Sequence, residues 1–285
     1  MSRIALVTDS TAMLPASQAA ERGVTVVPLQ VIVGAQAYAE GVDPEATPET
    51  IAEALRSYTP VSTSRPTPSV FLETYEQLAA DGAEAVLSIH ISSELSGTYE
   101  SAQLAAREAS IPVRAIDTRQ LGMATGYAVL AAADVVDAGG SFEEAAGAAL
   151  ARASRTTSLF YVDTLEYLRR GGRIGTAAAL LGSALAVKPL LTVEDGRITT
   201  REKVRTAGRA VARLEELTVQ AAGDLPVDVA VAHLAAPDRA ATLAERLRER
   251  LATNLGGRDV FAGEVGAVLG AHVGPGMVAV VLAPR

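Results

Sequence analysis

The chain has 285 residues, with 33 Asp and Glu against 25 Lys and Arg, a formal net charge of −8 and 49% hydrophobic residues. This length is enough for one large or two modest domains, and the hydrophobic content excludes intrinsic disorder. The acidic balance argues against a nucleic-acid binder, because phosphate backbones are bound by clustered Lys and Arg. The absence of Cys excludes disulfides, thiolate nucleophiles and most structural zinc sites.

Apolar tracts are short throughout the chain. The first apolar run, residues 4–7, is too short for a signal peptide, and the longest, residues 176–187, is too short to span a membrane. We therefore expect a cytoplasmic protein.

Runs rich in Val and Ile alternate with Ala-rich segments of helical period. This alternation is typical of an α/β fold with mainly parallel sheets. Glu194-Asp195-Gly196 predicts a hairpin turn. We expect strands over residues 4–8, 24–33, 85–89, 113–116, 158–162, 190–193, 198–201, 227–232, 260–264 and 277–282.

Several helices have readable starts. Thr followed by Pro, at 47–48 and at 67–68, combines an N-cap with a proline in the first turn. Ser141 and Glu144 form a capping box. A shift towards Arg and Gly near residue 156 predicts two domains, 1–155 and 156–285. We expect helices over residues 49–57, 69–81, 99–109, 142–153 and 237–255.

The usual motifs of nucleotide hydrolysis, dinucleotide binding and zinc proteolysis are absent from the sequence. The three histidines, His90, His233 and His272, lie in different segments, so we expect no metal site.

Three hydroxyl-rich loops follow predicted strands, where open α/β sheets bind ligands. They cover residues 8–11, 61–67 and 90–99. Asp9 in the first loop is either a catalytic nucleophile, a metal ligand or the organiser of an Asx turn. In the third loop, backbone N–H groups near Gly97 lie at the start of a predicted helix and attract anions, although ordinary N-capping also explains these residues.

Glycines flank basic residues in the second half of the chain, in segments 168–175 and 270–276, and Arg205 lies in a third basic segment. Glycine lets the backbone approach a ligand, and Arg suits bidentate recognition of carboxylate or phosphate. Arg170 could equally complement a helix dipole. His272 has glycine neighbours that cannot bond its ring through side chains, which favours a ligand-facing role.

Taken together, these segments resemble the DegV family along almost the whole chain. Arg65 stands where that family often has Gln. The resemblance rests on Thr8-Asp9-Ser10, Thr63-Ser64-Arg65-Pro66, the block 91–102, Asp117-Thr118, the segment 170–174, Lys188-Pro189 and the segment 272–276.

The resemblance implies two α/β domains that bind one long-chain fatty acid, with the carboxylate near the domain interface and the acyl tail in an apolar tunnel. It also implies a non-catalytic subunit of a bacterial fatty acid kinase, active in phospholipid metabolism. A separate ATP-binding subunit would phosphorylate the bound acid. We expect no cofactor besides the fatty acid, no nucleic-acid partner and only transient membrane contact.

The resemblance also implies roles for particular residues. Thr63 and Ser96 would bond the carboxylate, with help from the Gly97 N–H. Arg205 and His272 would lie near the head group and steady the phosphate, and Arg170 is a weaker candidate for this role or for docking the kinase. The small residues of segment 177–187 are candidates for the tunnel wall, or simply for a core helix.

Two other functions remain open at this stage. The chain could be a hydrolase or phosphotransferase that uses Asp9 or Ser96, with His90 or His272 as the base. It could also be a lipid-sensing transcriptional or signalling module, which the acidity and the lack of a helix-turn-helix candidate disfavour. Residues 152–213 hold 12 Lys and Arg and only 5 Asp and Glu, so the second half contains a basic segment that could meet an anionic head group.

Overall fold

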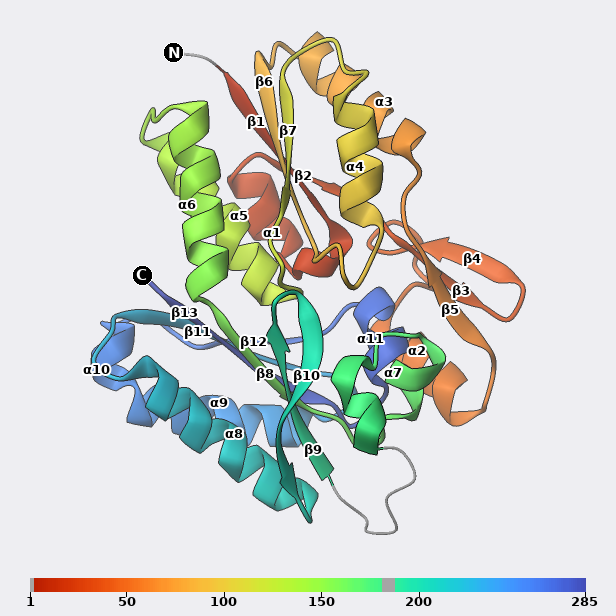
Figure 1. The fold of residues 1–285 in the computed structure, drawn as a ribbon, viewed down its shortest axis with the longest axis vertical. Coiled ribbons are helices and arrows are strands. Elements are labelled where there is room, and N and C mark those ends of the chain that lie inside the picture. The colour runs from red at the N-terminus through yellow and green to blue at the C-terminus, as the bar shows by residue number, and fades with distance from the viewer. Residues whose placement is uncertain (1–2, 181–187) are drawn as a thin grey trace.

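The structure is a computed structural model that describes residues 3–180 and 188–285. The chain forms two larger β-sheets, each packed against helices, and a small antiparallel sheet that we call the arm (Figure 1). Part of the segment 177–187, a candidate tunnel wall, lies outside the described residues, namely 181–187. No helix in the described part of the chain has the length and apolar character needed to cross a membrane.

The first sheet has four parallel strands in the order β2-β1-β6-β7, as expected from the alternating pattern. Buried Val, Ile and Leu fill both of its faces, which is typical of a parallel sheet covered by helices. Its strands are β1 Ile4–Asp9, β2 Val24–Val27, β6 Ala85–His90 and β7 Val113–Asp117.

Helices cover this sheet on both sides (Figure 1). On one face, α1 (Ala16–Glu21), α5 (Met123–Asp137) and α6 (Phe142–Arg155) pack through small Ala side chains. On the other face, α3 (Pro68–Ala80) packs through larger and aromatic residues, whereas α4 (Thr98–Ala106) packs through small Ala side chains. The capping box of α6 is present as predicted.

The second sheet has six strands in the order β10-β9-β8-β13-β11-β12. The expectation of a mainly parallel sheet is wrong here, because only the β11–β12 pair is parallel. The β9–β10 pair is the predicted hairpin. The strands are β8 Thr157–Tyr161, β9 Lys188–Glu194, β10 Arg197–Val204, β11 Val227–His233, β12 Phe261–Glu264 and β13 Val278–Pro284.

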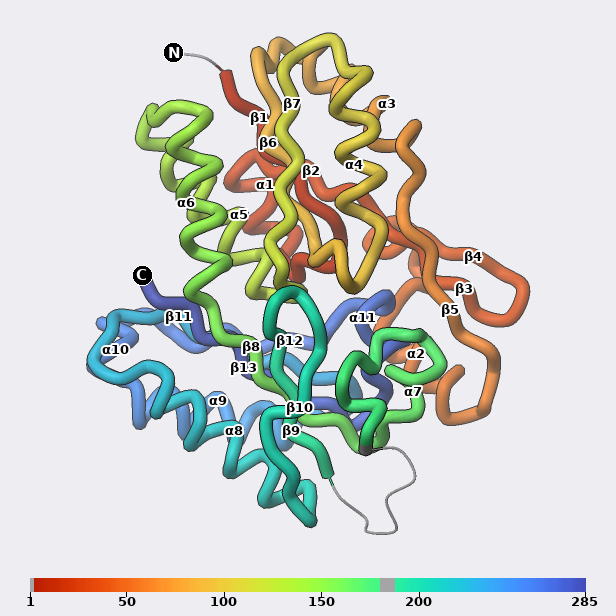
Figure 2. Tube along the Cα trace, in the orientation of Figure 1, coloured from red at the N-terminus to blue at the C-terminus, as the bar shows by residue number. Residues whose placement is uncertain are grey.

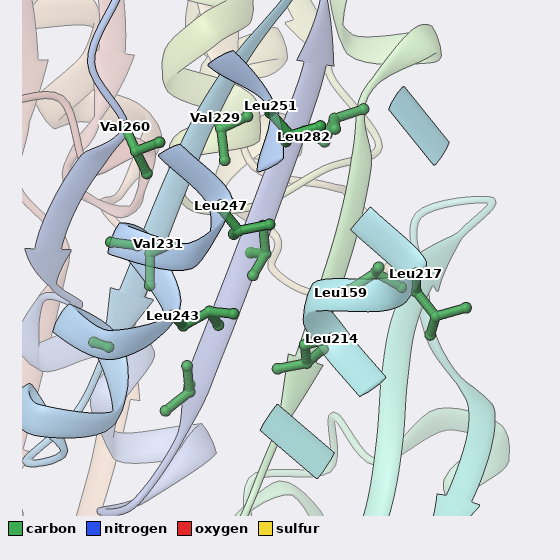
Figure 3. Packing of buried hydrophobic residues seen from close by; sticks show 14 of the residues in the cluster. Leu159, Leu214, Leu217, Val229, Val231, Leu243, Leu247, Leu251, Val260 and Leu282 are labelled. Carbon is green, nitrogen blue, oxygen red and sulfur yellow. The ribbon is translucent and has the colours of Figure 1, made fainter. Parts of the chain in front are cut away.

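One face of the second sheet packs against α8 (Ala207–Ala222) and α9 (Pro237–Arg250). Figure 3 shows this core, in which leucines such as Leu214 and Leu243 meet valines of the strands. The helix expected over 237–255 is broken at Leu251, and its last turn is a separate helix, α10 (Ala252–Leu255). The other face of the sheet contributes to an apolar cluster that also contains first-half residues such as Ile91.

The small arm is a three-stranded sheet in the order β4-β3-β5, with β3 at Gln30–Val33, β4 at Gln36–Ala39 and β5 at Val61–Ser64. The single strand expected over 24–33 is wrong. Pro28 has no N–H for a sheet ladder, and the chain turns there from β2 into the arm. Helix α2 (Pro48–Arg56), capped by Thr47 as predicted, connects β4 to β5.

The arm belongs to the first half of the chain but packs against the second. Its apolar side chains form one cluster with α11 (Ala267–Val273), which lies beside β3, β5 and α2 (Figure 2). The short helices α7 (Glu166–Arg170), η1 (Ser10–Ala12) and η2 (Gly175–Leu180) complete the described elements. The division of the chain at 155/156 stays a prediction.

The two halves also meet at the hairpin between β9 and β10. The Ser92 hydroxyl, just after β6, donates to the Gly196 carbonyl at 2.8 Å, and Arg119 donates to the carbonyl of Asp195. A Cβ at Gly196 would lie 2.4 Å from Ser92 Oγ, so this close contact requires glycine. The hairpin thus fixes the second sheet against the loop that follows β6.

Candidate head-group site and apolar slot

A cavity of about 350 Å³ lies where the arm, the loop after β6, α11 and the segment after α7 come together. We call it the head-group cavity. Its polar lining comes from both halves of the chain: Thr11, Thr63, Ser64, Arg65, Ser96, Gly97, Arg173 and His272. The structure therefore brings together four of the six candidate residues, Thr63, Ser96, Gly97 and His272.

Thr63 is on strand β5 and not in the loop that the sequence suggested. Its register against Val31 of β3 fixes its position in the arm. His272 is on helix α11, one residue before that helix ends at Val273. Thr63 Oγ1 lies 2.8 Å from His272 Nε2, so the arm and α11 meet through this pair.

The imidazole of His272 is neutral at pH 7. Burial, and to a smaller extent the charge of Arg173, lowers its pKa to about 4. Its Nδ1 is buried and has no hydrogen-bond partner among residues 3–180 and 188–285. Because an unpaired buried N–H is costlier than an unpaired lone pair, the proton belongs on Nε2, which donates to Thr63. The Thr63 hydroxyl proton is then free to donate to a ligand in the cavity.

The loop after β6 supplies the second polar wall. The Ser96 hydroxyl lies 2.8 Å from the Thr98 hydroxyl, and Gly97 is the N-cap of α4, as expected. Arg65 and Arg173 were not assigned a role from the sequence. Arg65 Nη1 donates to the Gly97 carbonyl at 3.3 Å, and Arg173 Nε donates to the Leu95 carbonyl at 2.9 Å.

The other two candidates lie outside this cavity. Arg205 is exposed just after the end of β10, and it lines neither the head-group cavity nor the apolar slot described next. Arg170 is exposed on α7 and pairs with Glu166 at 2.8 Å. Their proposed roles must therefore be exercised at the surface and not inside the cavity.

A second, narrower cavity of about 60 Å³ lies against the first-half side of the second sheet. We call it the apolar slot, because among the described residues that line it only Ser158 has a polar side chain, and its hydroxyl already donates to Gln120. Met13, Met123 and Met277 all line it. Four residues line both the slot and the head-group cavity: Leu121, Ile198, Leu269 and Val273.

Asp9 is inaccessible as a nucleophile. It is fully buried, and its carboxylate accepts bonds from the Thr11 N–H, the Ile91 N–H and His90 Nδ1 at 3.1, 3.2 and 2.9 Å. His90 Nε2 lies 2.7 Å from the Ser88 hydroxyl, which is buried as well. The Asx turn considered for Asp9 is present, and this Asp-His-Ser chain fixes two residues of the cavity wall, Thr11 and Ile91.

Ser96 has no general base at its hydroxyl. Among residues 3–180 and 188–285, neither a histidine nor a carboxylate is hydrogen-bonded to it, and its hydroxyl pairs with the hydroxyl of Thr98. In that same part of the chain, no group of three or more His, Asp or Glu is arranged to hold a metal ion. The geometry thus offers a binding cavity with neutral hydroxyls and two arginines.

Comparison with known proteins decides the family. The family described as "Uncharacterised protein, DegV family" matches residues 3–285. The chain belongs to the DegV family. A DegV domain-containing protein of Streptomyces coelicolor is 55% identical over 286 residues, with 100% of both chains covered.

Solved DegV structures share the whole fold. A DegV family protein from Thermus thermophilus, described by its fatty acid binding, has a TM-score of 0.91 at 35% identity, covering 99% of this chain and 100% of its own. DegV from Bacillus subtilis, described as a fatty acid binding protein, has a TM-score of 0.91 at 31% identity, with both chains fully covered. The expected family and its two-domain α/β fold are confirmed.

Proposed function

We propose that this chain binds one long-chain fatty acid, with its carboxylate in the head-group cavity and its acyl tail in the apolar slot. The observation that carries the proposal is that four residues line both cavities, while Thr63, Ser96 and His272 line only the head-group cavity. Fatty acid binding by the DegV proteins of Thermus thermophilus and Bacillus subtilis supports the same ligand class.

The carboxylate would accept hydrogen bonds from the hydroxyls of Thr63 and Ser96, with the Gly97 N–H as a third donor. The Nε2–H of His272 donates to the Thr63 oxygen. The hydroxyl proton of Thr63 is therefore left for the ligand carboxylate. Uncharged donors are enough to hold the carboxylate, because the tail supplies most of the binding free energy. Each buried CH₂ of the tail contributes roughly 0.8 kcal/mol.

The tail requires the slot to widen from its volume of about 60 Å³. The slot is suited to this, because the three methionines that line it have unbranched, adaptable side chains. The tail would pass between Leu121, Ile198, Leu269 and Val273 and separate the first half of the chain from the second sheet.

The protein would then present the bound acid to a separate ATP-dependent fatty acid kinase in the cytoplasm, without catalysing the transfer itself. Two features support this division of labour: Asp9 is enclosed, and Ser96 has no general base in the described part of the chain. Exposed Arg205 and Arg170 would meet the kinase or the phosphate at the protein surface. Contact with the membrane would be transient, to collect the lipid.

Native mass spectrometry of protein purified from a bacterial host tests the binding step. We expect a co-purifying mass in the long-chain fatty acid range, and a reduced bound fraction in Thr63→Val and Ser96→Ala. Ser154→Ala, on the exposed surface of α6, is the matched control. A protein that carries no lipid and takes up neither added palmitate nor oleate would refute the proposal.

A further inference from the structure

A larger cavity lies where helices α5 and α6 meet the second sheet. It measures about 690 Å³ and takes walls from both halves of the chain, and none of its described lining residues belongs to the head-group cavity. Helices α5 and α6 both contact β13 there (Figure 1). We call it the arginine groove, because five arginines line it: Arg22, Arg152, Arg155, Arg258 and Arg285.

Three of these arginines share one carboxylate. Asp228 of β11 is ion-paired with Arg152. Its Oδ1 also lies 3.0 Å from Nη1 of Arg258 and 3.7 Å from Nη1 of Arg285. Three positive charges against one negative charge leave an excess of two at this point. The lining side chains as a whole give the same balance, since five arginines stand against three aspartates.

Arg152 is held in place by the protein itself. Its guanidinium donates to Asp228 and to the carbonyl of Pro284, and it lies over the ring of Tyr127, 5.6 Å from the ring centre. Tyr127 is buried, and this burial, together with the charge of Asp228, raises the pKa of its hydroxyl. The hydroxyl therefore stays protonated. A fixed cation and a neutral donor thus line the groove side by side, whereas Arg258 is exposed and can turn towards a ligand.

The rest of the groove wall is apolar. Phe261 of β12 is half-buried and packs in one cluster with Tyr127 and Leu130 of α5. Ala148 and Ala151 of α6 also line the groove, and their small side chains leave room for a flat ring. Aromatic rings and guanidinium planes are the surfaces on which nucleobases stack. The volume of the groove also lies within the range of small-molecule sites, about 300–1,000 Å³.

We propose that the arginine groove binds a nucleoside monophosphate, with its phosphate among the arginines around Asp228 and its base against Phe261. A phosphate monoester carries about −1.5 to −2 charges at pH 7, which matches the excess of two positive charges. Arginine also binds phosphate through two parallel hydrogen bonds, so the fixed Arg152 and its neighbours provide directed donors. This inference goes beyond the proposed function and does not depend on lipid binding.

Isothermal titration calorimetry with AMP, adenosine and inorganic phosphate tests the proposal. We expect one AMP per chain, bound more tightly than adenosine or phosphate, because only AMP reaches both the arginines and the apolar wall. Arg258→Gln should weaken AMP binding by about tenfold and leave adenosine binding unchanged, since it removes a charged donor to the phosphate. Arg107→Gln, an exposed change at the end of α4 with the same loss of charge, should alter neither affinity.

A second variant changes the shape of the groove and not its charge. Ala151→Leu places a larger side chain on the wall, so it should weaken the binding of both AMP and adenosine. Ala241→Leu adds the same group on the exposed side of α9 and should leave both affinities unchanged.

Three results would overturn the proposal. The first is wild type that binds no AMP, and the second is inorganic phosphate that binds as tightly as AMP. The third is AMP binding that Arg65→Gln weakens and Arg258→Gln does not, which would place the phosphate in the head-group cavity. Since no lipid takes part in these measurements, each of these results leaves the proposed fatty acid binding standing. A protein without co-purifying lipid, in turn, leaves nucleotide binding standing.

Discussion

The hydroxyl of Thr63 and Nε2 of His272 lie 2.8 Å apart, although 209 positions separate the two residues in the chain. This bond joins the arm to α11 and sets the direction of the Thr63 hydroxyl proton. The head-group cavity thus depends on the protonation state of one buried imidazole.

Stability should depend on pH through His272. Its pKa is lowered from 6.5 to about 4, so between these values the unfolded chain binds a proton that the folded chain does not. The free energy of unfolding should therefore fall as the pH drops through this range, with a slope of at most about 1.4 kcal/mol per pH unit. Urea unfolding of wild type and His272→Gln measures this, and a difference between them that does not vary with pH would contradict it.

Gly171 should be intolerant of a side chain, because the imidazole of His272 packs directly against it. A Cβ there would lie 2.2 Å from Nδ1 of His272, while its φ of −72° suits alanine. We expect Gly171→Ala to displace the imidazole and weaken palmitate binding by about tenfold. Gly147→Ala, in α6 with nothing within 4 Å, is the control. It should raise stability by up to about 1 kcal/mol and leave binding unchanged.

Filling the apolar slot should separate long from short ligands. Ala279 of β13 lines the slot, so Ala279→Leu places three further carbons where the tail would lie. We expect palmitate binding to fall more than octanoate binding, because the shorter tail reaches less of the slot. Ala262→Leu, on the exposed side of β12, adds the same group elsewhere. Equal losses for both acids would place the tail outside the slot.

Asp9 should matter for stability. Asp9→Ala leaves the N–H groups of Thr11 and Ile91 and Nδ1 of His90 without a buried acceptor. We expect a loss on the order of 3 kcal/mol or more in urea unfolding. Asp117→Ala, which removes a half-buried carboxylate bonded to Ser93, should cost less. A fully stable Asp9→Ala protein would show that the chain through His90 does not hold the cavity wall.

Arg205 should act after binding. Because it lies outside both cavities, Arg205→Ala should retain palmitate with unchanged affinity. If it meets the kinase or the new phosphate, the variant should lower the rate of acyl phosphate formation with the partner kinase and ATP. An unchanged rate would remove Arg205 from the proposed mechanism.

Local features of the fold were readable from the sequence, and long-range ones were not. The caps at Thr47 and Ser141 and the hairpin at Asp195 depend on neighbouring residues, so their signals are complete in short segments. Strand direction in the second sheet depends on pairings between distant segments, which periodicity does not encode. The arm was missed because its strands are four residues long and Pro28 interrupts the run that contains the first of them.

The site was predictable to a similar degree. The resemblance to the DegV family implied that Thr63, Ser96, Gly97 and His272 share one site, and all four line one cavity. Arg173 was missed because its side chain acts on Leu95, which is remote in sequence. The methionines of the slot carry no local signal at all, since a methionine in a core and one in a binding channel have the same neighbours in sequence.

The packing of the arm on α11 has a consequence for cooperativity. The head-group cavity takes walls from both halves of the chain, so a bound lipid stabilises only states in which both halves are folded and in contact. Ligand binding should therefore merge the unfolding of the two halves into one transition. The lipid would act as a mobile part of the hydrophobic core, delivered after folding and removed without unfolding.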